Sequence, residues 1–298
     1  MKRNFKNKKS FDNSKLFFCI YKLFDQRLNK LYNVNMNLVQ NNFYIFGLRF
    51  SMYGLLIAVG MLLAIFVVCK ITNKRGMKPE DIYLVALYAI PLAIIGARLY
   101  YVIFSDHSFT FWEIFEIWNG GMAIYGGVIG GCLGVVLYCA IHKKNFLKIA
   151  DLAVVGLILG QAIGRIGCYF GGCCYGIEVV NEGAMWFPLS VQINGVWHYS
   201  TFFYESICDF IIFAILLYFI LKHKQANGSI LCMYLCFYGF IRCIIEQFRG
   251  DSLYFLGIKV SQLLSIGLMI LGIILLIIIN TKSKKGKSVE NNSNNKVD

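Results

Sequence analysis

The sequence predicts an all-α integral membrane protein with seven transmembrane helices, and three observations lead to that class. Charged residues make up only 15% of the 298 residues and hydrophobic residues 58%, whereas soluble domains carry about 25% charged residues. The charges gather at both ends and between apolar stretches of about 20 residues, the length that crosses a hydrocarbon core. Basic residues are confined to alternate loops, as expected for a bilayer topology. A soluble protein with buried helices explains these observations less well.

Seven apolar stretches have the required length. In chain order they are 51–69, 82–104, 123–141, 150–169, 201–221, 230–248 and 258–280. Pro91 lies within the second stretch and is expected to kink it, because proline lacks the N–H group that a helix interior needs.

The third and fourth stretches carry stripes of glycine. The stripes are Gly126, Gly130 and Gly134 in the third stretch and Gly156, Gly160 and Gly164 in the fourth. Glycines four residues apart let helix backbones pack closely in lipid, and we expect packing to be their main role. Glycyl N–H groups exposed at a helix end could also bind a phosphate.

The loops predict the orientation. Loops 71–81, 142–149 and 222–229 and the C-terminal tail carry lysine or arginine, whereas 105–120 and 170–200 carry none. Because basic loops stay in the cytoplasm, the N-terminus is expected outside and the C-terminus inside. Segment 170–200 is then a small extracytoplasmic cap.

Three regions follow along the chain. Residues 1–44 form a basic N-terminal extension, 45–281 the membrane domain, and 282–298 a polar tail that we expect to be disordered. The first 35 residues hold nine basic residues and two acidic ones, although the orientation places them outside. Translation that begins at Met36 would remove this conflict. A basic segment lying on the membrane surface is the alternative.

The remaining composition argues against nucleic-acid binding and metal binding. The net charge of +13 lies in short loops and tails, where membrane proteins place it for orientation. The histidines fall in loops or at helix ends, so no buried histidine metal site is expected. Cys168, Cys173 and Cys174 lie at the outer end of the fourth stretch, but their C-x4-C-C spacing matches no common zinc pattern. Small-residue packing or a disulfide is favoured there, with no metal and no cofactor.

The chemistry is predicted to lie in charged residues within the spans. Such a charge costs roughly 2.5–3.5 kcal/mol at the bilayer centre and usually faces a cavity. Eight charged residues within or next to the spans are candidates: Arg98, Asp151, Arg165, Glu205, Asp209, Arg242, Glu246 and Arg249. Arginines and acids are equal in number, so internal ion pairing could satisfy them all, and Arg242 is expected to pair with Glu246 one turn away. Four of them, Arg98, Asp151, Glu205 and Asp209, are assigned to structural roles or ion pairs.

Two arginines stand out as phosphate ligands. Arg165 and Arg249 lie toward the outer leaflet with no acid one turn away on their own helices. Guanidinium groups bind phosphate in a bidentate manner. The headgroup of an anionic phospholipid, entering from the bilayer, is the ligand expected for them.

Five segments resemble those of the prolipoprotein diacylglyceryl transferase family. They are GARLYYV (96–102), WNGGMAIYGGVIGG (118–131), GQAIGRIGCYFGGCCYG (160–176), FYES (203–206) and YGFIRCIIEQFRGD (238–251). They occur in the family's order, and MYG at 52–54 fits its aromatic-Tyr-Gly motif near the first span. The combination of GRIG with RCIIEQFR is specific, and the resemblance covers roughly residues 45–280.

The resemblance implies a multi-pass transferase of the bacterial plasma membrane. Such an enzyme moves the diacylglyceryl group of phosphatidylglycerol to the thiol of a prolipoprotein lipobox cysteine, forming a thioether and releasing glycerol phosphate. Its partners are then phosphatidylglycerol, the lipobox peptide and membrane lipids. We expect it to act as a monomer.

The resemblance also implies site residues. The family's essential arginines correspond to Arg165 and Arg242, which would stabilise the charge growing on the leaving phosphate. The residues assigned to catalysis are Arg165, Arg242, Glu246 and Tyr125. Those assigned to phosphatidylglycerol binding are Arg165, Arg249, Tyr53, Gly120, Gly126, Cys168 and Gly176, and Asp151 also matches a supporting residue.

The chain departs from the family pattern on the acceptor side. Tyr125 stands where many members have histidine, Cys168 stands where they have asparagine after GRIG, and the run 199–205 lacks their His-Pro start. We therefore expect Glu246 or solvent to accept the proton of the thiol, with Tyr125 hydrogen-bonding the lipid or the acceptor.

Two other functions stay open at this point. A divergent membrane transferase with a different acceptor would keep Arg165 and Arg242 while changing the acceptor side. A small-solute transporter would also place charges within spans, but it should show two matching halves with broken helices. No convincing internal repeat is present in the sequence.

Overall fold

The computed structural model describes residues 42–45, 48–105, 107, 109–117, 120–193, 195–222, 226–250, 254–255 and 258–294. The extension up to residue 41, with the proposed start at Met36, lies outside the described residues. Within them the chain is mostly helical, and seven helices are long and apolar enough to cross a membrane. They correspond in number and order to the seven predicted stretches.

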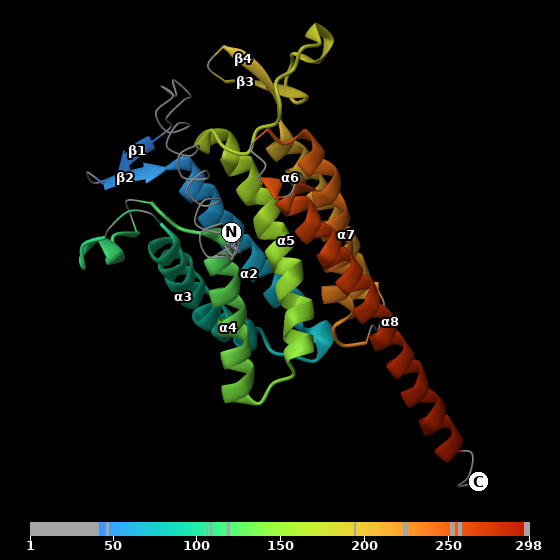
Figure 1. Cartoon of the computed structure of the whole chain (residues 1–298). Helices are drawn as coiled ribbons and strands as arrows, with labels where there is room; N and C mark the ends of the chain where they lie inside the picture. Colours follow the sequence, from blue (N-terminus) through green and yellow to red (C-terminus); the bar gives the residue numbers. More distant parts are fainter. Residues whose placement is uncertain are drawn as a thin grey trace, which may run out of the picture.

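The seven long helices run back and forth as one bundle (Figure 1). They are α2 (Met52–Ile71), α3 (Pro79–Phe104), α4 (Ile124–His142), α5 (Phe146–Gly171), α6 (Thr201–Lys222), α7 (Ser229–Ile245) and α8 (Val260–Asn294). Short 3-10 turns follow α2 (η1, Thr72–Arg75) and α7 (η5, Glu246–Phe248), and two more lie between helices (η2, Glu113–Phe115; η4, Glu182–Ala184).

Three two-stranded antiparallel hairpins complete the described fold. They are β1 (Asn42–Ile45) with β2 (Leu48–Ser51), β3 (Ser190–Ile193) with β4 (Val196–Tyr199), and β5 (Tyr254–Phe255) with β6 (Ile258–Lys259). The β3–β4 hairpin lies at one end of the bundle (Figure 1), which we call the hairpin end. Val191 and Ile193 of this hairpin pack with Cys168 of α5 and Phe202 of α6. The segment predicted to be a cap therefore rests on the ends of these two helices.

Local signals explain where several helices begin. The Ser51 hydroxyl accepts the Gly54 N–H at 3.0 Å, and the Asn145 side chain accepts the N–H groups of Leu147 and Lys148. Helix α3 begins with Pro79, whose missing N–H costs nothing at a first helical position. It continues through Pro91 to Phe104.

Close backbone packing is the role of the glycine stripe in α4. A Cβ atom added to Gly134 would lie 2.6 Å from the Ala89 Cα of α3, and one on Gly126 would overlap the Gly96 carbonyl. In α5 only Gly156 is similarly tight, with 2.9 Å to Val68 of α2. The other two glycines of that stripe, Gly160 and Gly164, have room for a methyl group.

Helix α5 is the most deeply buried of the seven and packs against α2, α6 and α7. Two of its charged residues, Arg165 and Asp151, form ion pairs with other elements, with Glu205 of α6 and Arg75 of η1.

The C-terminal region differs from the expectation at one boundary. The tail from Lys282 was expected to be disordered, whereas α8 continues as helix to Asn294. A preceding membrane helix removes the nucleation cost for the residues that follow, so a polar sequence can extend it.

Candidate active site

Two arginines from different helices share one carboxylate near the hairpin end. Arg165 of α5 and Arg242 of α7 each place a guanidinium nitrogen 2.7 Å from the same Glu205 Oε1 of α6. The side chains of Arg165 and Arg242 are 17% and 15% exposed, and that of Glu205 is 2% exposed. The two residues predicted to be essential are thus brought together by a third that was assigned only a structural role.

Glu246 completes this ion-pair cluster. The second nitrogen of Arg242 lies 3.3 Å from Glu246 Oε2, as the spacing of the two residues predicted. Glu246 is 1% exposed. Because breaking a buried ion pair leaves an uncompensated charge, the four side chains hold one another in a fixed arrangement.

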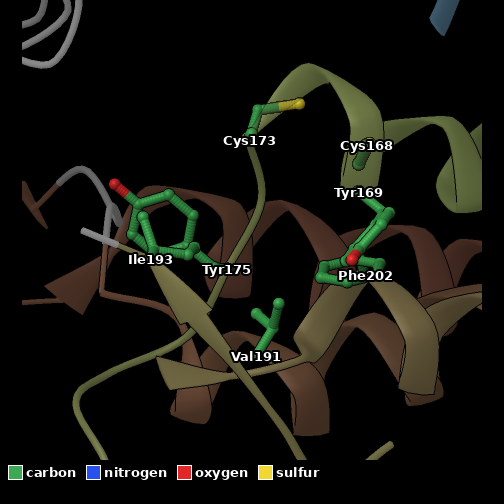
Figure 2. A pocket seen from close by; sticks show the side chains of 8 residues that line it. Cys168, Tyr169, Cys173, Tyr175, Val191, Ile193 and Phe202 are labelled. Atoms are coloured by element: carbon green, nitrogen blue, oxygen red, sulfur yellow. The ribbon is translucent and has the colours of Figure 1, made fainter. Parts of the chain in front are cut away.

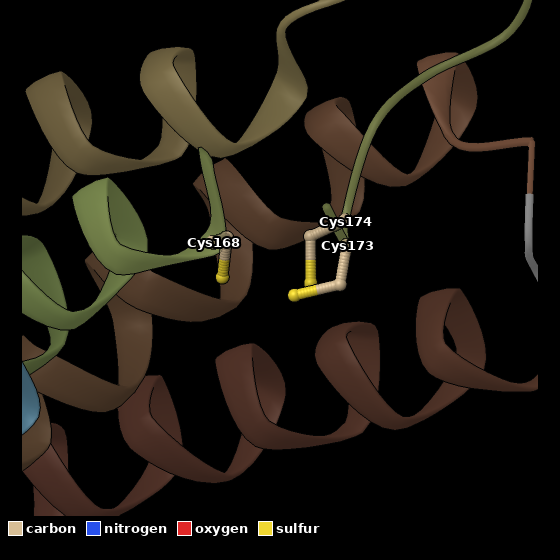
Figure 3. A group of neighbouring side chains, drawn as sticks. All are labelled: Cys168, Cys173 and Cys174. Atoms are coloured by element: carbon tan, nitrogen blue, oxygen red, sulfur yellow. The ribbon is translucent and has the colours of Figure 1, made fainter. Parts of the chain in front are cut away.

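A group of three thiols adjoins the arginine cluster. The Sγ atoms of Cys168, Cys173 and Cys174 all lie within 4.8 Å of one another, and all three thiols are free (Figure 3). Arg165 Nη1 donates to Cys174 Sγ at 3.6 Å. Hydrogen bonds from the other two thiols, and then the charges of Arg165 and Arg249, lower the pKa of the Cys174 thiol.

Two of the three cysteines, Cys168 and Cys173, border a small open hollow between α5 and the β3–β4 hairpin (Figure 2). Its walls are largely apolar: Cys168, Tyr169, Gly172, Cys173, Tyr175, Val191, Ile193 and Phe202. Tyr53 of α2 lies nearby, since a Cβ added to Gly167 or Gly171 would meet its ring at 3.0 and 3.6 Å. The predicted lipid residues Tyr53 and Cys168 therefore lie beside the cluster.

Gly176 and Arg249 meet through their backbones, which form an isolated antiparallel bridge. A Cβ at Gly176 would lie 2.7 Å from the Phe248 carbonyl, so only glycine fits there. Lys259, which the sequence did not single out, donates to the Glu246 carbonyl at 2.5 Å and to the Arg249 carbonyl at 3.3 Å. It fixes the end of α7, and its only sequence signal is a lone lysine at the start of the last span.

Three other predicted site residues lie on the α3–α4 side of the bundle. Tyr125 is half exposed in the first turn of α4, and its ring centroid lies 6.3 Å from that of Tyr100. Gly126 packs against α3, and Gly120 has a positive φ of 86° with open space around it. No hydrogen bond found among the described residues joins Tyr125 to the ion-pair cluster.

Arg98 contacts backbone carbonyls, and no acidic partner is found for it among the described residues. Its guanidinium group donates to four backbone carbonyls, those of Glu113, Ile114, Gly120 and Gly121, at 2.5–3.0 Å. These carbonyls satisfy the hydrogen-bond donors of the buried guanidinium group. Arg98 thereby fixes the segment that joins α3 to α4.

The two remaining acids have different roles. Asp151, at the opposite end from the hairpin, accepts the N–H groups of Gly228 and Leu231 at 2.9 Å and lies 3.3 Å from Arg75. It caps α7 and pairs with a loop arginine. Asp209 is fully buried, and neither carboxyl oxygen has a hydrogen-bond partner among the described residues. No ion pair of Asp209 is found within the described part of the chain, and Glu205, one turn away, contacts both arginines.

The fold and this cluster define a multi-pass membrane protein with paired guanidinium groups buried near one end of its helices. The chain belongs to the prolipoprotein diacylglyceryl transferase family, because the model of that family matches residues 40–278.

Individual relatives agree with this assignment. A phosphatidylglycerol–prolipoprotein diacylglyceryl transferase of Finegoldia magna is 40% identical over 235 residues, covering 78% of this chain and 92% of the relative. Proteins of the same name from Clostridioides difficile and Streptococcus pneumoniae are 38% and 42% identical. They cover 83% and 77% of this chain, and 98% and 90% of their own lengths.

Proposed function

We propose that this chain transfers the diacylglyceryl group of phosphatidylglycerol to the lipobox cysteine of a prolipoprotein. The relatives carry this activity in their names. The observation that carries the proposal is the pair of guanidinium groups that Glu205 holds together within the bundle. The reaction forms a thioether and releases glycerol phosphate.

The arginines suit a phosphate leaving group. Each guanidinium has five N–H donors, and the contacts of Arg165 to Glu205 and Cys174 use two of them. The remaining donors can bind phosphate oxygens whose charge grows as the carbon–oxygen bond breaks. In a water-poor site such fixed donors stabilise the developing charge more than water does.

The residues proposed to bind phosphatidylglycerol lie in two places in the bundle. Arg249, Tyr53, Cys168 and Gly176, which lie around the cluster, contribute to lipid binding directly or by shaping the site. Gly120 and Gly126 act from the α3–α4 side. The resemblance supports the binding role of Arg249, Tyr53, Gly176, Gly120 and Gly126. Cys168 departs from the family pattern and is included because it lies beside the thiol that Arg165 contacts.

The loop charges support one orientation. Loops 71–81, 142–149 and 222–229 carry lysine or arginine, whereas 105–120 and 170–200 carry none. By the positive-inside rule the hairpin end then faces outward, the N-terminus lies outside, and the C-terminus lies in the cytoplasm. The enzyme then works in the bacterial plasma membrane, as a monomer, where phosphatidylglycerol and exported prolipoproteins meet.

Complementation tests this function. A bacterial strain depleted of its own transferase should regain lipidation of a lipobox substrate when it expresses this chain, seen as a mass increase of one diacylglyceryl group. If a well-expressed chain left the substrate unmodified, a divergent transferase with another acceptor would replace the present proposal.

The proton acceptor is tested by two substitutions. Replacing Glu246 by glutamine is expected to lower turnover about 10²-fold, within the range for loss of a general base. Replacing Tyr125 by phenylalanine should lower it less than tenfold, because one hydrogen bond to a substrate is worth about 1 kcal/mol. Transfer of labelled lipid to a lipobox peptide in detergent measures both. The reverse order of effects would remove Glu246 from this role.

A further inference from the structure

We propose that Cys168, Cys173 and Cys174 hold a zinc ion beside Arg165, with a fourth coordination position for the thiol of the acceptor cysteine. This inference rests on the proposed function, and it assigns to the three thiols the activation of the nucleophile. The sequence did not predict it, since the C-x4-C-C spacing resembles no common zinc motif. The fold nevertheless brings the three sulfur atoms close enough to bind one metal ion.

The distances suit tetrahedral coordination. With zinc–sulfur bonds of about 2.3 Å, sulfur atoms around one zinc ion are about 3.8 Å apart. The three Sγ atoms already lie within 4.8 Å of one another, so small side-chain rotations would complete the site. Three protein ligands with one open position are the arrangement of catalytic zinc sites.

The backbone is shaped to bring the sulfurs together. Helix α5 ends at Gly172 in the left-handed conformation, and the Cys173 N–H returns to the Cys168 carbonyl at 3.1 Å. Cys174 follows with a φ of +60°. A positive φ is uncommon for residues other than glycine. This second left-handed residue turns the chain back so that both adjacent thiols face Cys168 (Figure 3).

The charges around the thiols also fit. Zinc with three thiolates carries one net negative charge, and Arg165 Nη1 lies 3.6 Å from Cys174 Sγ to balance it. Cys168 and Cys173 also line the small apolar hollow (Figure 2), and in this proposal the acceptor peptide approaches the zinc ion from that side.

The reaction needs a group that deprotonates the acceptor thiol. The acceptor thiol has a pKa near 8.5 and reacts only as thiolate. The ion-pair cluster contains no histidine, and its carboxylates, Glu205 and Glu246, are engaged in ion pairs that make them weak bases. Zinc lets a weak base such as Glu246 or water suffice, because it lowers the pKa of the thiol. A thiol that coordinates zinc loses its proton, here to water or Glu246.

The transfer step balances without an oxidant. The zinc-bound sulfur attacks the glyceryl carbon, and a carbon–sulfur bond forms as the carbon–oxygen bond to phosphate breaks. The phosphate oxygen keeps the electron pair of the broken bond and leaves as glycerol phosphate beside the arginines. The neutral thioether is a weak zinc ligand and dissociates.

Zinc content measured on the full chain tests the proposal without reference to activity. Protein purified in detergent with zinc present and no chelator should hold about one zinc ion per chain by mass spectrometry, and X-ray absorption should show sulfur ligands at about 2.3 Å. Cys173→Ser and Cys174→Ser should each bring the zinc content close to zero. Cys132→Ser, which removes an exposed cysteine of α4, should leave it unchanged.

Three results would overturn the proposal. They are the absence of zinc from the wild-type protein, a zinc content of the two serine variants equal to that of wild type, and a disulfide among the three cysteines found by thiol titration. Size-exclusion chromatography confirms that each variant is folded, and Cys173→Ser, at a partly exposed position, provides a second variant should Cys174→Ser misfold. If zinc is bound but no lipobox peptide is modified, the metal site stands and the proposed function fails.

Discussion

Replacing Arg165 with alanine is expected to lower the rate of diacylglyceryl transfer by about 10³-fold or more, the upper range for loss of one oxyanion donor. The effect should be large because Arg165 meets both Glu205 and the cysteine group, and we propose that it also binds the leaving phosphate. Since the phosphate gains charge as the bond breaks, the loss should fall mainly on kcat. A purified transfer assay with labelled phosphatidylglycerol measures kcat and KM separately. Lysine at this position should restore little activity, because an ammonium group cannot donate in the same bidentate way.

Arg75 provides the matched control for this experiment. It is also a buried arginine paired with a carboxylate, Asp151, but it lies at the opposite end of the bundle. Arg75→Lys should lower thermal stability while leaving turnover per folded molecule near that of wild type. Equal turnover by Arg165→Ala and wild type would remove Arg165 from the mechanism.

The number and approximate limits of the helices could be predicted because each span is a local property of composition. An apolar stretch long enough for the bilayer satisfies its backbone hydrogen bonds within itself, so its neighbours hardly alter its position in the sequence. The glycine stripe of α4 could be predicted for the same reason, since its spacing lies on one helix face. Only the polar end of α8, which depends on the helix before it, was assigned differently.

The contacts between helices could not be predicted with the same success. The Arg242–Glu246 pair lies on one helix and was found from its spacing. Glu205 was not recognised as the shared partner of Arg165 and Arg242, because nothing in the sequence tells which helices are neighbours. The partners of Arg98 could not be predicted either. They are backbone carbonyls, which every residue has, so the identity of the residues does not indicate them.

Glu205→Gln is expected to lower stability by about 3 kcal/mol, because loss of one partner from a buried ion pair costs about 3–5 kcal/mol. Both arginines would lose the carboxylate that holds them, and their like charges would then repel each other. Transfer activity should fall about 10²-fold, comparable to the loss of one preorganised donor. Thermal unfolding in detergent and the transfer assay measure the two effects. Combined with Arg165→Ala, the effects on kcat should be strongly non-additive, since the two residues act as a unit.

Asp209→Asn is the control that distinguishes loss of the Glu205 bridge from the loss of stability that follows any change of a buried acid. Asp209 lies one turn further along the same helix and is also fully buried, but its oxygens have no hydrogen-bond partner among the described residues. The amide therefore replaces a carboxyl group that makes no ion pair, and it removes a possible like charge from the neighbourhood of Glu205. Stability and turnover should stay near wild type for Asp209→Asn while both fall for Glu205→Gln. If the two variants behaved alike, the bridging of Arg165 and Arg242 by Glu205 would not be what holds the phosphate site together.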